Sequence, residues 1–227
     1  MDEKCIAGRS SRASAADDLD FYPTPPWATR ALLERLPGDL SKQTVWEPAC
    51  GRGDMVRVLA SRFKKVIATD IEPRGCGSQL DFLTCESGVK VDWIITNPPF
   101  NQAENFALRA LRFHQVRNLA LLVRTVWLHG GGRYERLFAP RPPSIVYLFC
   151  ERPAMLRGRL ERKATTTTDY AWVVWCDDYP PAPGPVVKWI PPGTRCALDS
   201  FGDYDDDAPG LLAGIEDDRR IVRAGCG

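Results

Sequence analysis

The residues with the clearest chemical potential are the four of the run Asn97-Pro98-Pro99-Phe100, which follows an apolar, strand-like segment. Ile94 and its neighbours favour a buried strand, whereas proline has no backbone N–H and cannot continue a central strand. Asn97 is therefore expected where the strand leaves the sheet, at the carboxyl edge where open α/β sheets bind ligands. The prolines stiffen the turn, so the Asn97 amide and the Pro98 carbonyl become preset hydrogen-bond acceptors beside the Phe100 ring.

Such a corner suits the alkylation of an aromatic exocyclic amine, whose lone pair is delocalised into its ring and is poorly nucleophilic. The two acceptors would hold the amine hydrogens and direct the nitrogen lone pair at an incoming methyl group, while Phe100 stacks on the ring. This is catalysis by orientation, and it requires no histidine. An Asn-Pro pair also commonly begins an ordinary turn, so the tetrapeptide alone leaves that interpretation open.

A second candidate site lies in residues 44–54, which predict a strand followed by a Gly-x-Gly turn that opens a helix over residues 54–64. Gly51 and Gly53 would let the backbone approach a ligand closely, and the helix N-terminus adds free amide donors. Val56 occupies the third glycine position of the dinucleotide fingerprint, which argues against an NAD-type site.

Asp70 is a candidate ligand-binding acid. It ends a second short strand, residues 65–69, and follows the glycines by about 20 residues. In doubly wound folds, an acid at that place grips the diol of a ribose. The glycine turn and Asp70 together predict a ribose-containing ligand.

In their order and spacing, these motifs resemble those of class I S-adenosylmethionine-dependent methyltransferases, and among them the amino-methyltransferases that modify adenine N6 in nucleic acid. The resemblance spans residues 20–176 and implies S-adenosylmethionine as the cofactor. It implies catalytic roles for Asn97, Pro98, Pro99 and Phe100. It implies cofactor contacts from Tyr22, Thr24, Pro25, Glu47, Ala49, Gly51, Gly53, Asp70, Ile71, Asp81 and Phe82.

Two of these motifs acquire specific roles only through the resemblance. In the family, the acid that matches Asp81 hydrogen-bonds the adenine amine of the cofactor, and the apolar residue that matches Phe82 packs on the adenine ring. Residues 21–26, Phe-Tyr-Pro-Thr-Pro-Pro, resemble the segment that closes over the methionine end of the cofactor.

The resemblance implies transfer of a methyl group to the N6 amine of adenine in DNA. Small phage-type and prophage-type DNA adenine methyltransferases share the size and motif layout, including a strand like residues 168–175. Enzymes that methylate guanine N2 in ribosomal RNA, or glutamine in release factors, carry a similar signature that usually ends in tyrosine, so Phe100 favours adenine. RNA as the substrate, and a noncatalytic nucleic-acid-binding scaffold, stay open as alternatives. The target sequence and the oligomeric state do not follow from the sequence.

Alternating helix and strand patterns predict an α/β fold with a mainly parallel sheet. Residues 27–36 place Trp27, Ala31 and Leu32 on one face of an amphipathic helix. The resemblance implies a Rossmann-like fold with a seven-stranded sheet, an antiparallel last strand and helices on both faces. The later elements are expected at residues 101–115 (helix), 118–127 (strand), 131–138 (helix), 144–150 (strand) and 170–176 (last strand).

Three segments are expected along the chain. Residues 1–18 are polar and without periodicity, which predicts a mobile N-terminal tail. Residues 19–192 are expected to form the catalytic methyltransferase domain, whose compact part ends at the proline-rich residues 180–185. Residues 193–227 are acidic and predict a flexible C-terminal tail, in which the aspartates from Asp203 onward are solvated rather than metal-binding.

Residues 151–163 form a basic segment, which holds five cations in thirteen residues. On a chain whose net charge is only +1, such a cluster near the catalytic edge is expected to contact nucleic-acid phosphates. A solvated loop is the alternative interpretation. The candidate contacts are Arg152, Arg157, Arg159, Arg162 and Lys163.

Length and composition predict one catalytic domain. At 227 residues, 44% of them hydrophobic, the chain can bury one sizeable core. The eight cysteines include no Cys-x-x-Cys pair and two histidines cannot complete a zinc-ligand pattern, so we expect reduced thiols and no metal. No apolar run reaches membrane-spanning length and no signal peptide is recognisable, so we expect a cytoplasmic location. The resemblance implies a bacterial host cell or a phage as the source.

Overall fold

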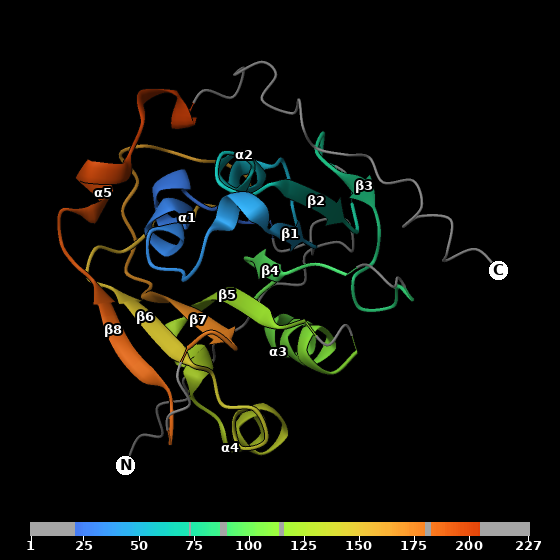
Figure 1. Cartoon of the computed structure of the whole chain (residues 1–227). Coiled ribbons are helices and arrows are strands. Elements are labelled where there is room, and N and C mark those ends of the chain that lie inside the picture. The colour runs from blue at the N-terminus through green and yellow to red at the C-terminus, as the bar shows by residue number, and fades with distance from the viewer. Residues whose placement is uncertain (1–20, 73, 87–89, 114–115, 180–182, 205–227) are drawn as a thin grey trace, which may run out of the picture.

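The computed structural model describes residues 21–72, 74–86, 90–113, 116–179 and 183–204, and a mixed sheet forms its centre (Figure 1). The strand order across the sheet is β3-β2-β1-β4-β5-β7-β6-β8. The strands are β1 (Thr44–Glu47), β2 (Lys65–Asp70), β3 (Ser78–Gln79), β4 (Trp93–Thr96), β5 (Asn118–Arg124), β6 (Ile145–Phe149), β7 (Tyr170–Cys176) and β8 (Val186–Ile190).

The first five strands all run parallel, and β7 runs antiparallel to both of its neighbours, β5 and β6. From β1 the chain moves outward to β2 and β3, and then returns to place β4 on the other side of β1. The strand order therefore reverses between β1 and β4. Open α/β sheets bind ligands outside the carboxyl ends of the strands at this kind of reversal.

Helices cover both faces of the sheet (Figure 1). The α1 and α2 helices pack on one face and α3 on the other, while α5 packs beside α1. The helices are α1 (Pro26–Leu33), α2 (Asp54–Ala60), α3 (Ala103–Leu108), α4 (Gly131–Arg133) and α5 (Thr194–Leu198). Shorter turns are the 3-10 segments Leu40–Lys42, Thr125–Leu128 and Phe201–Tyr204, and the π-helical segments Arg109–Phe113 and Tyr134–Phe138.

Two hydrophobic clusters form the core, one on each face of the sheet. Trp172 and Trp175 lie three positions apart on β7, so they point to opposite faces, and each is buried in a different cluster. Their indole N–H groups donate to the carbonyls of Ala28 (3.0 Å) and Arg141 (2.8 Å). Both tryptophans therefore serve as core residues.

The predicted Rossmann-like fold is confirmed, with differences at the ends of elements. The helix expected at 101–115 begins as α3 and continues as a π-helical segment to Phe113. The strand expected at 118–127 ends at Arg124, because residues Thr125–Leu128 turn as a 3-10 segment. Asn97 follows β4 directly, so the tetrapeptide leaves the sheet at its carboxyl edge as expected.

The sheet has eight strands in the described residues, whereas the sequence predicted seven. The additional strand, β8, pairs in parallel with β6 from Ile145↔Val186 to Phe149↔Ile190. The proline-rich residues before it suggested that compact structure ended at residue 185. Proline is compatible with the ends of an edge strand, however, and β8 lies at the edge of the sheet. The antiparallel strand is β7, and it is not the last strand of the chain.

Folded structure also continues beyond residue 192, into α5 and the 3-10 segment that ends at Tyr204. The Arg30 guanidinium pairs with the Asp203 carboxylate through two hydrogen bonds, of 2.6 and 2.7 Å. The predicted boundary at residue 192 therefore falls inside the fold, and Asp203 is an ion-pair partner rather than a solvated acid. The predicted N-terminal tail, residues 1–18, and the chain after residue 204 lie outside the described residues.

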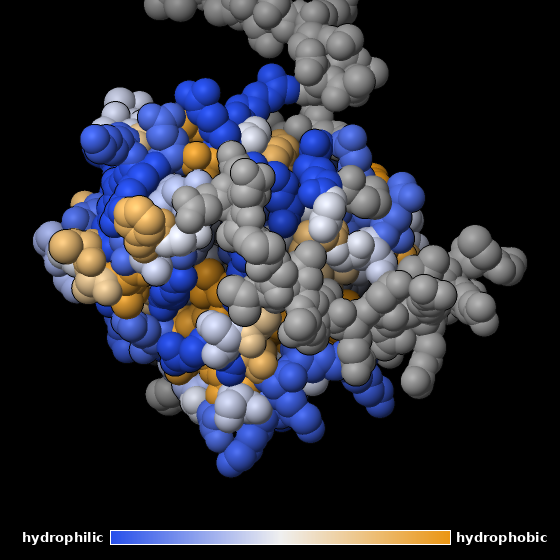
Figure 2. All heavy atoms as spheres, turned by 90° about the horizontal axis from the view of Figure 1, so that it is seen from above, coloured by the Kyte–Doolittle hydropathy of each residue, from blue (hydrophilic) through white to orange (hydrophobic). Residues whose placement is uncertain are grey.

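Viewed from above, the surface is mainly hydrophilic and its apolar residues form separate patches (Figure 2). Large hydrophobic side chains that are exposed include Val126, Trp189 and Phe201. None of the helices in the described ranges combines the length and the apolar character that crossing a membrane requires.

Candidate active site

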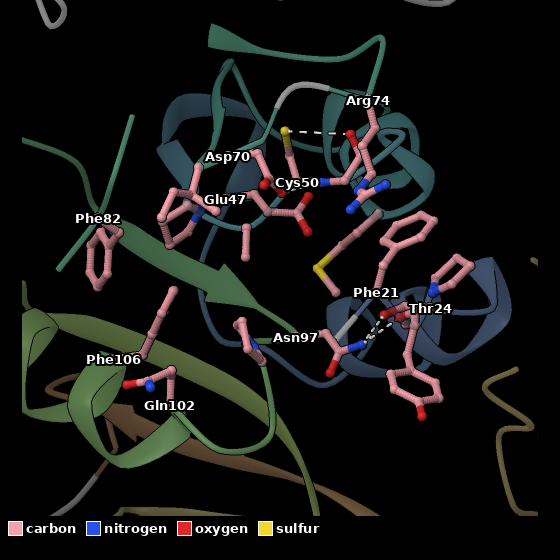
Figure 3. Close-up of a pocket in the computed structure, with 18 of the residues that line it drawn as sticks. Phe21, Thr24, Glu47, Cys50, Asp70, Arg74, Phe82, Asn97, Gln102 and Phe106 are labelled. Carbon is pink, nitrogen blue, oxygen red and sulfur yellow. Dashed lines mark hydrogen bonds between the residues drawn. The ribbon is translucent and has the colours of Figure 1, made fainter. Parts of the chain in front are cut away.

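A cavity of about 320 Å³ opens at the carboxyl edge of the sheet, beside the reversal between β1 and β4 (Figure 3). This volume lies in the range of small-molecule binding sites. Three strands bring polar side chains to it, because Glu47 ends β1, Asp70 ends β2 and Asn97 follows β4. The parallel arrangement of these strands places all three side chains at one edge of the sheet.

The loop after β1 contacts the cavity through backbone. Gly51 has a φ of +52°, and a Cβ at this position would lie 2.5 Å from Cε2 of Phe21, so a larger residue would have to displace that ring. The Gly51 N–H donates to Oδ2 of Asp70 over 2.8 Å, and the Glu72 N–H donates to Oδ1 over 2.9 Å. Two backbone amides thus fix the Asp70 carboxylate, which retains lone pairs for a ligand.

Cys50 lies in the same loop with its thiol buried. Its Sγ donates to the carbonyl of Cys76 over 3.3 Å. The side-chain hydrogen bond with Cys76, and then burial, raise the pKa of the Cys50 thiol. The thiol therefore stays protonated at neutral pH and is a poor nucleophile, which agrees with a packing role for this small residue.

Glu47 is an acid buried in the cavity wall, with only 2% of its surface exposed. Burial raises the pKa of its carboxyl well above the ordinary value, and the neighbouring Cys76, Asp54 and Asp70 raise it further. Its Oε2 has no hydrogen-bond partner among the described residues. A buried oxygen without a partner is costly, so this atom is suited to accept a hydrogen bond from a ligand in the cavity.

The part of the cavity beside β2 and α3 combines apolar surfaces with an acid (Figure 3). Ile71 is hydrophobic yet 51% exposed, and Phe82 packs 4.9 Å from Phe106 between ring centroids. The Asp81 carboxylate accepts the backbone N–H of Leu83 over 2.9 Å, which fixes its orientation. A flat apolar ring that carries an amino group fits this combination.

Asn97 is held by the segment that precedes α1. Its Nδ2 donates to the Tyr22 carbonyl and to Oγ1 of Thr24, each over 3.0 Å (Figure 3). A carbonyl can only accept, so the nitrogen must face Tyr22 and Oδ1 must face away from it. Oδ1 is buried and receives no hydrogen bond from the described residues. The structure thus contains an oriented acceptor without a donor.

No protein-family model matches the chain. A curated relative, the type II methyltransferase M.CvrRI of Paramecium bursaria Chlorella virus XZ-6E, is 30% identical over 104 residues, which cover 40% of this chain and 27% of the relative. The chain therefore matches only about a quarter of the length of that relative.

Solved structures resemble the fold. A modification subunit assigned to a type I restriction enzyme from Vibrio vulnificus YJ016 has a TM-score of 0.52 at 17% identity, over 79% of this chain and 49% of that chain. A protein assigned as an RNA methyltransferase from Pyrococcus horikoshii has a TM-score of 0.51 at 18% identity, over 69% of this chain and 87% of that chain. The chain has the class I methyltransferase fold.

Of the eleven residues predicted to contact the cofactor, nine line the cavity and two do not. Pro25 precedes α1. Gly53 is the N-cap of α2 and has a φ of +88°, and a Cβ at this position would lie 2.6 Å from Sγ of Cys76. Of the predicted catalytic residues, Asn97 and Pro99 line the cavity, whereas Pro98 and Phe100 lie beyond it. The nine lining residues are Tyr22, Thr24, Glu47, Ala49, Gly51, Asp70, Ile71, Asp81 and Phe82.

Several residues that line the cavity were not among the predicted site residues, including Phe21, Arg74, Gln102 and Phe106. Phe21 belongs to the segment that the resemblance identified, but no role was assigned to its ring. Gln102 and Phe106 lie four residues apart at the start of α3, directly after the tetrapeptide. That helical spacing could have indicated that both face the cavity.

The basic segment, residues 151–163, lies beside the cavity. Its Gly158 N–H donates to the carbonyl of Phe21 over 2.9 Å, and Phe21 lines the cavity. Part of its charge is balanced locally. Arg152 pairs with Asp169 over 2.5 Å, Arg159 with Glu161 over 3.3 Å, and Arg162 with Asp199 over 3.2 Å. Lys163 is exposed. A phosphate-binding role for the segment stays a prediction.

Proposed function

We propose that this protein transfers a methyl group from S-adenosylmethionine to the exocyclic N6 amine of adenine in DNA. The observation that carries the proposal is Oδ1 of Asn97, a buried acceptor with a fixed orientation and no donor among the described residues. It lies in the wall of a cavity whose other residues suit a nucleoside-containing cofactor.

The residues of the cavity fit S-adenosylmethionine. The exposed side chain of Ile71 and the ring of Phe82 would pack on the adenine, with Asp81 accepting its amine. Asp70 would accept from the ribose hydroxyls. Glu47, with Oε2 unpartnered, would accept from the methionine end. The cofactor supplies a methyl group that is activated by its positively charged sulfur.

The target amine would be held by oxygen acceptors. Oδ1 of Asn97 and the Pro98 carbonyl would each accept one N–H of the amine, which points the nitrogen lone pair toward the cavity. These acceptors stabilise the nitrogen as it becomes tetrahedral and gains positive charge. Phe100, outside the cavity, would stack on the base once that base has left its own stack.

Two observations favour DNA as the substrate. One similar protein is named a type II methyltransferase, and one similar structure is a modification subunit of a restriction enzyme. The basic segment beside the cavity could contact a nucleic-acid backbone. A similar structure is also assigned as an RNA methyltransferase, so RNA needs its own arm in the test.

The test is transfer of labelled methyl from S-adenosylmethionine to unmethylated duplex DNA, total RNA and a protein extract in parallel. We expect label in DNA. Label only in RNA or only in protein would replace the proposed substrate, with guanine N2 of RNA and protein glutamine as the first products to seek. Absence of label in all three, together with binding of DNA, would indicate a noncatalytic nucleic-acid-binding protein.

A further inference from the structure

Arg124 is a basic residue at the catalytic edge to which sequence reasoning assigned no role. It is the last residue of β5, which lies beside β4 and therefore beside the tetrapeptide that follows β4. On its other side it pairs in register with Tyr170 of β7. The end of β5 and the turn after β4 thus bring the side chains of Arg124 and Phe100 together at the same edge of the sheet.

The Arg124 guanidinium lies over the face of the Phe100 ring, with 4.2 Å between its central carbon and the ring centroid. The aromatic neighbours of Phe100 contact it differently. Tyr22 and Tyr170 lie 5.2 and 6.1 Å away and are tilted by 40° and 38°, so neither ring stacks flat on it. Of these three neighbours, Arg124 is the one that lies over a face of the Phe100 ring.

Within the described residues, the charge of Arg124 is not paired with an acid. No carboxylate in the described ranges forms an ion pair with it, and its buried Nε has no hydrogen-bond partner there. Burial raises the pKa of the neighbouring Tyr170 hydroxyl, and the positive charge of Arg124 partly offsets that rise. Arg152 and Arg162 differ in this respect, because each has an aspartate partner. Arg124 thus keeps donor capacity for an anion.

A guanidinium is planar, and it stacks on an aromatic ring in the same way as a nucleobase. Its fork of N–H donors also matches a phosphate. One side chain could therefore cover Phe100 when no substrate is bound and bind a backbone phosphate when it is.

We propose that Arg124 occupies the stacking position of the target base on Phe100 and moves to a phosphate next to that base when the base enters. Arg124 is then a positioning residue. It covers Phe100 when no substrate is bound, and it binds a phosphate of the nucleic acid in the complex with substrate. The inference rests on the proposed function, because it requires a nucleic-acid base on Phe100.

The experiment compares the wild type with Arg124→Gln, Arg124→Lys and the control Arg117→Gln. Arg117 is 70% exposed, precedes β5 at the opposite edge of the sheet and pairs with Asp177. The affinity for unmethylated duplex DNA is measured at several salt concentrations, and KM and kcat are measured for methyl transfer. Thermal unfolding reports whether each variant folds.

We expect Arg124→Gln to raise KM for DNA on the order of tenfold. It should also lower the slope of log affinity against log salt by about 1, because one phosphate contact is lost. Arg124→Lys should keep the slope, since lysine retains a point charge, and Arg117→Gln should behave as the wild type. A merely structural role of Arg124 would not move the salt slope.

Methyl transfer to DNA by the wild type, with unchanged slope and KM in Arg124→Gln, would overturn this inference and leave the proposed function standing. Should Arg124→Gln fail to fold, a slope lowered by 1 in Arg124→Lys would overturn it as well. No methyl transfer to DNA by the wild type would overturn the proposed function first and the inference with it.

Discussion

Nδ2 of Asn97 donates a hydrogen bond to Oγ1 of Thr24 over 3.0 Å, although the two residues are 73 positions apart in the chain. Thr24 is 4% exposed and belongs to the segment that leads into α1. The amide that would orient the target amine is therefore itself oriented by a distant segment, which also lines the cavity.

The first prediction concerns this contact. Thr24→Val removes one of the three acceptors of the Asn97 nitrogen, which are the Tyr22 carbonyl, Oγ1 of Thr24 and Sδ of Met155. Methyl transfer should therefore fall on the order of tenfold, the value of one buried hydrogen bond. Single-turnover rates with saturating cofactor would measure the change. The matched control is Thr29→Val, because Oγ1 of Thr29 is buried and has no partner in the part of the chain that the structure describes. That variant should keep full activity and gain roughly 1 kcal/mol of stability. Equal rates in both variants would contradict the orienting role of Thr24.

The second prediction concerns Gly51. An alanine there is strained by the positive φ and meets the ring of Phe21, so Gly51→Ala should weaken S-adenosylmethionine binding measured by calorimetry. Gly75→Ala is the control, because Gly75 has a φ of +89° but open space around its Cβ position. Both variants should lose about 1–2 kcal/mol of stability, and only Gly51→Ala should lose affinity. Unchanged affinity in Gly51→Ala would remove this loop from the cofactor site.

The third prediction concerns the pH dependence that Glu47 introduces. A glutamate in the unfolded chain titrates near pH 4.5, whereas burial raises the pKa of folded Glu47 well above that value. Between the two pKa values the folded state holds the extra proton, so the free energy of unfolding falls as the pH rises through this window. Each unit by which the pKa is raised corresponds to about 1.4 kcal/mol.

Glu47→Gln removes this titration. Without cofactor, the variant should therefore be more stable than the wild type at pH 8, and the difference should shrink as the pH falls toward 4.5. Denaturant unfolding at a series of pH values measures it. A difference in stability that does not change with pH would show that Glu47 is ionised in the folded state.

The fourth prediction concerns thiol reactivity. Cys150 and Cys196 are exposed, whereas Cys50 and Cys76 are buried. Iodoacetamide should therefore modify Cys150 and Cys196 in the folded protein within minutes to hours, and should reach Cys50 only after unfolding. Peptide mass spectrometry measures each site. Fast modification of Cys50 in the folded protein would contradict its raised pKa.

The sequence was sufficient to predict the centre of the fold, because its signals there are local. Ile94, Asn97 and the two prolines together mark where a strand leaves the sheet, and β4 ends at Thr96. Gly51 was predicted to let the backbone approach a ligand; in the structure the ring of Phe21 lies close to it, and the ligand contact stays a prediction.

The outer parts of the fold were not predicted, because they form through contacts between residues that are distant in the chain, and local sequence patterns do not reveal such contacts. β8 forms because β6 offers a free edge to residues Val186–Ile190, although prolines surround that run. Asp203 belongs to an acidic stretch, yet Arg30 binds it from 173 positions earlier in the chain. The Arg124–Phe100 contact is of the same kind, because it requires two strands to be neighbours.

The most direct test of the central claim is nucleoside mass spectrometry of unmethylated duplex DNA after incubation with S-adenosylmethionine and either the wild type, Asn97→Ala or Asn105→Ala. Asn105 is an exposed asparagine on α3 and serves as the matched control. We predict N6-methyladenine with the wild type and with Asn105→Ala, and none with Asn97→Ala, which should still bind the cofactor. N6-methyladenine formed by Asn97→Ala at the rate of the wild type would contradict the account.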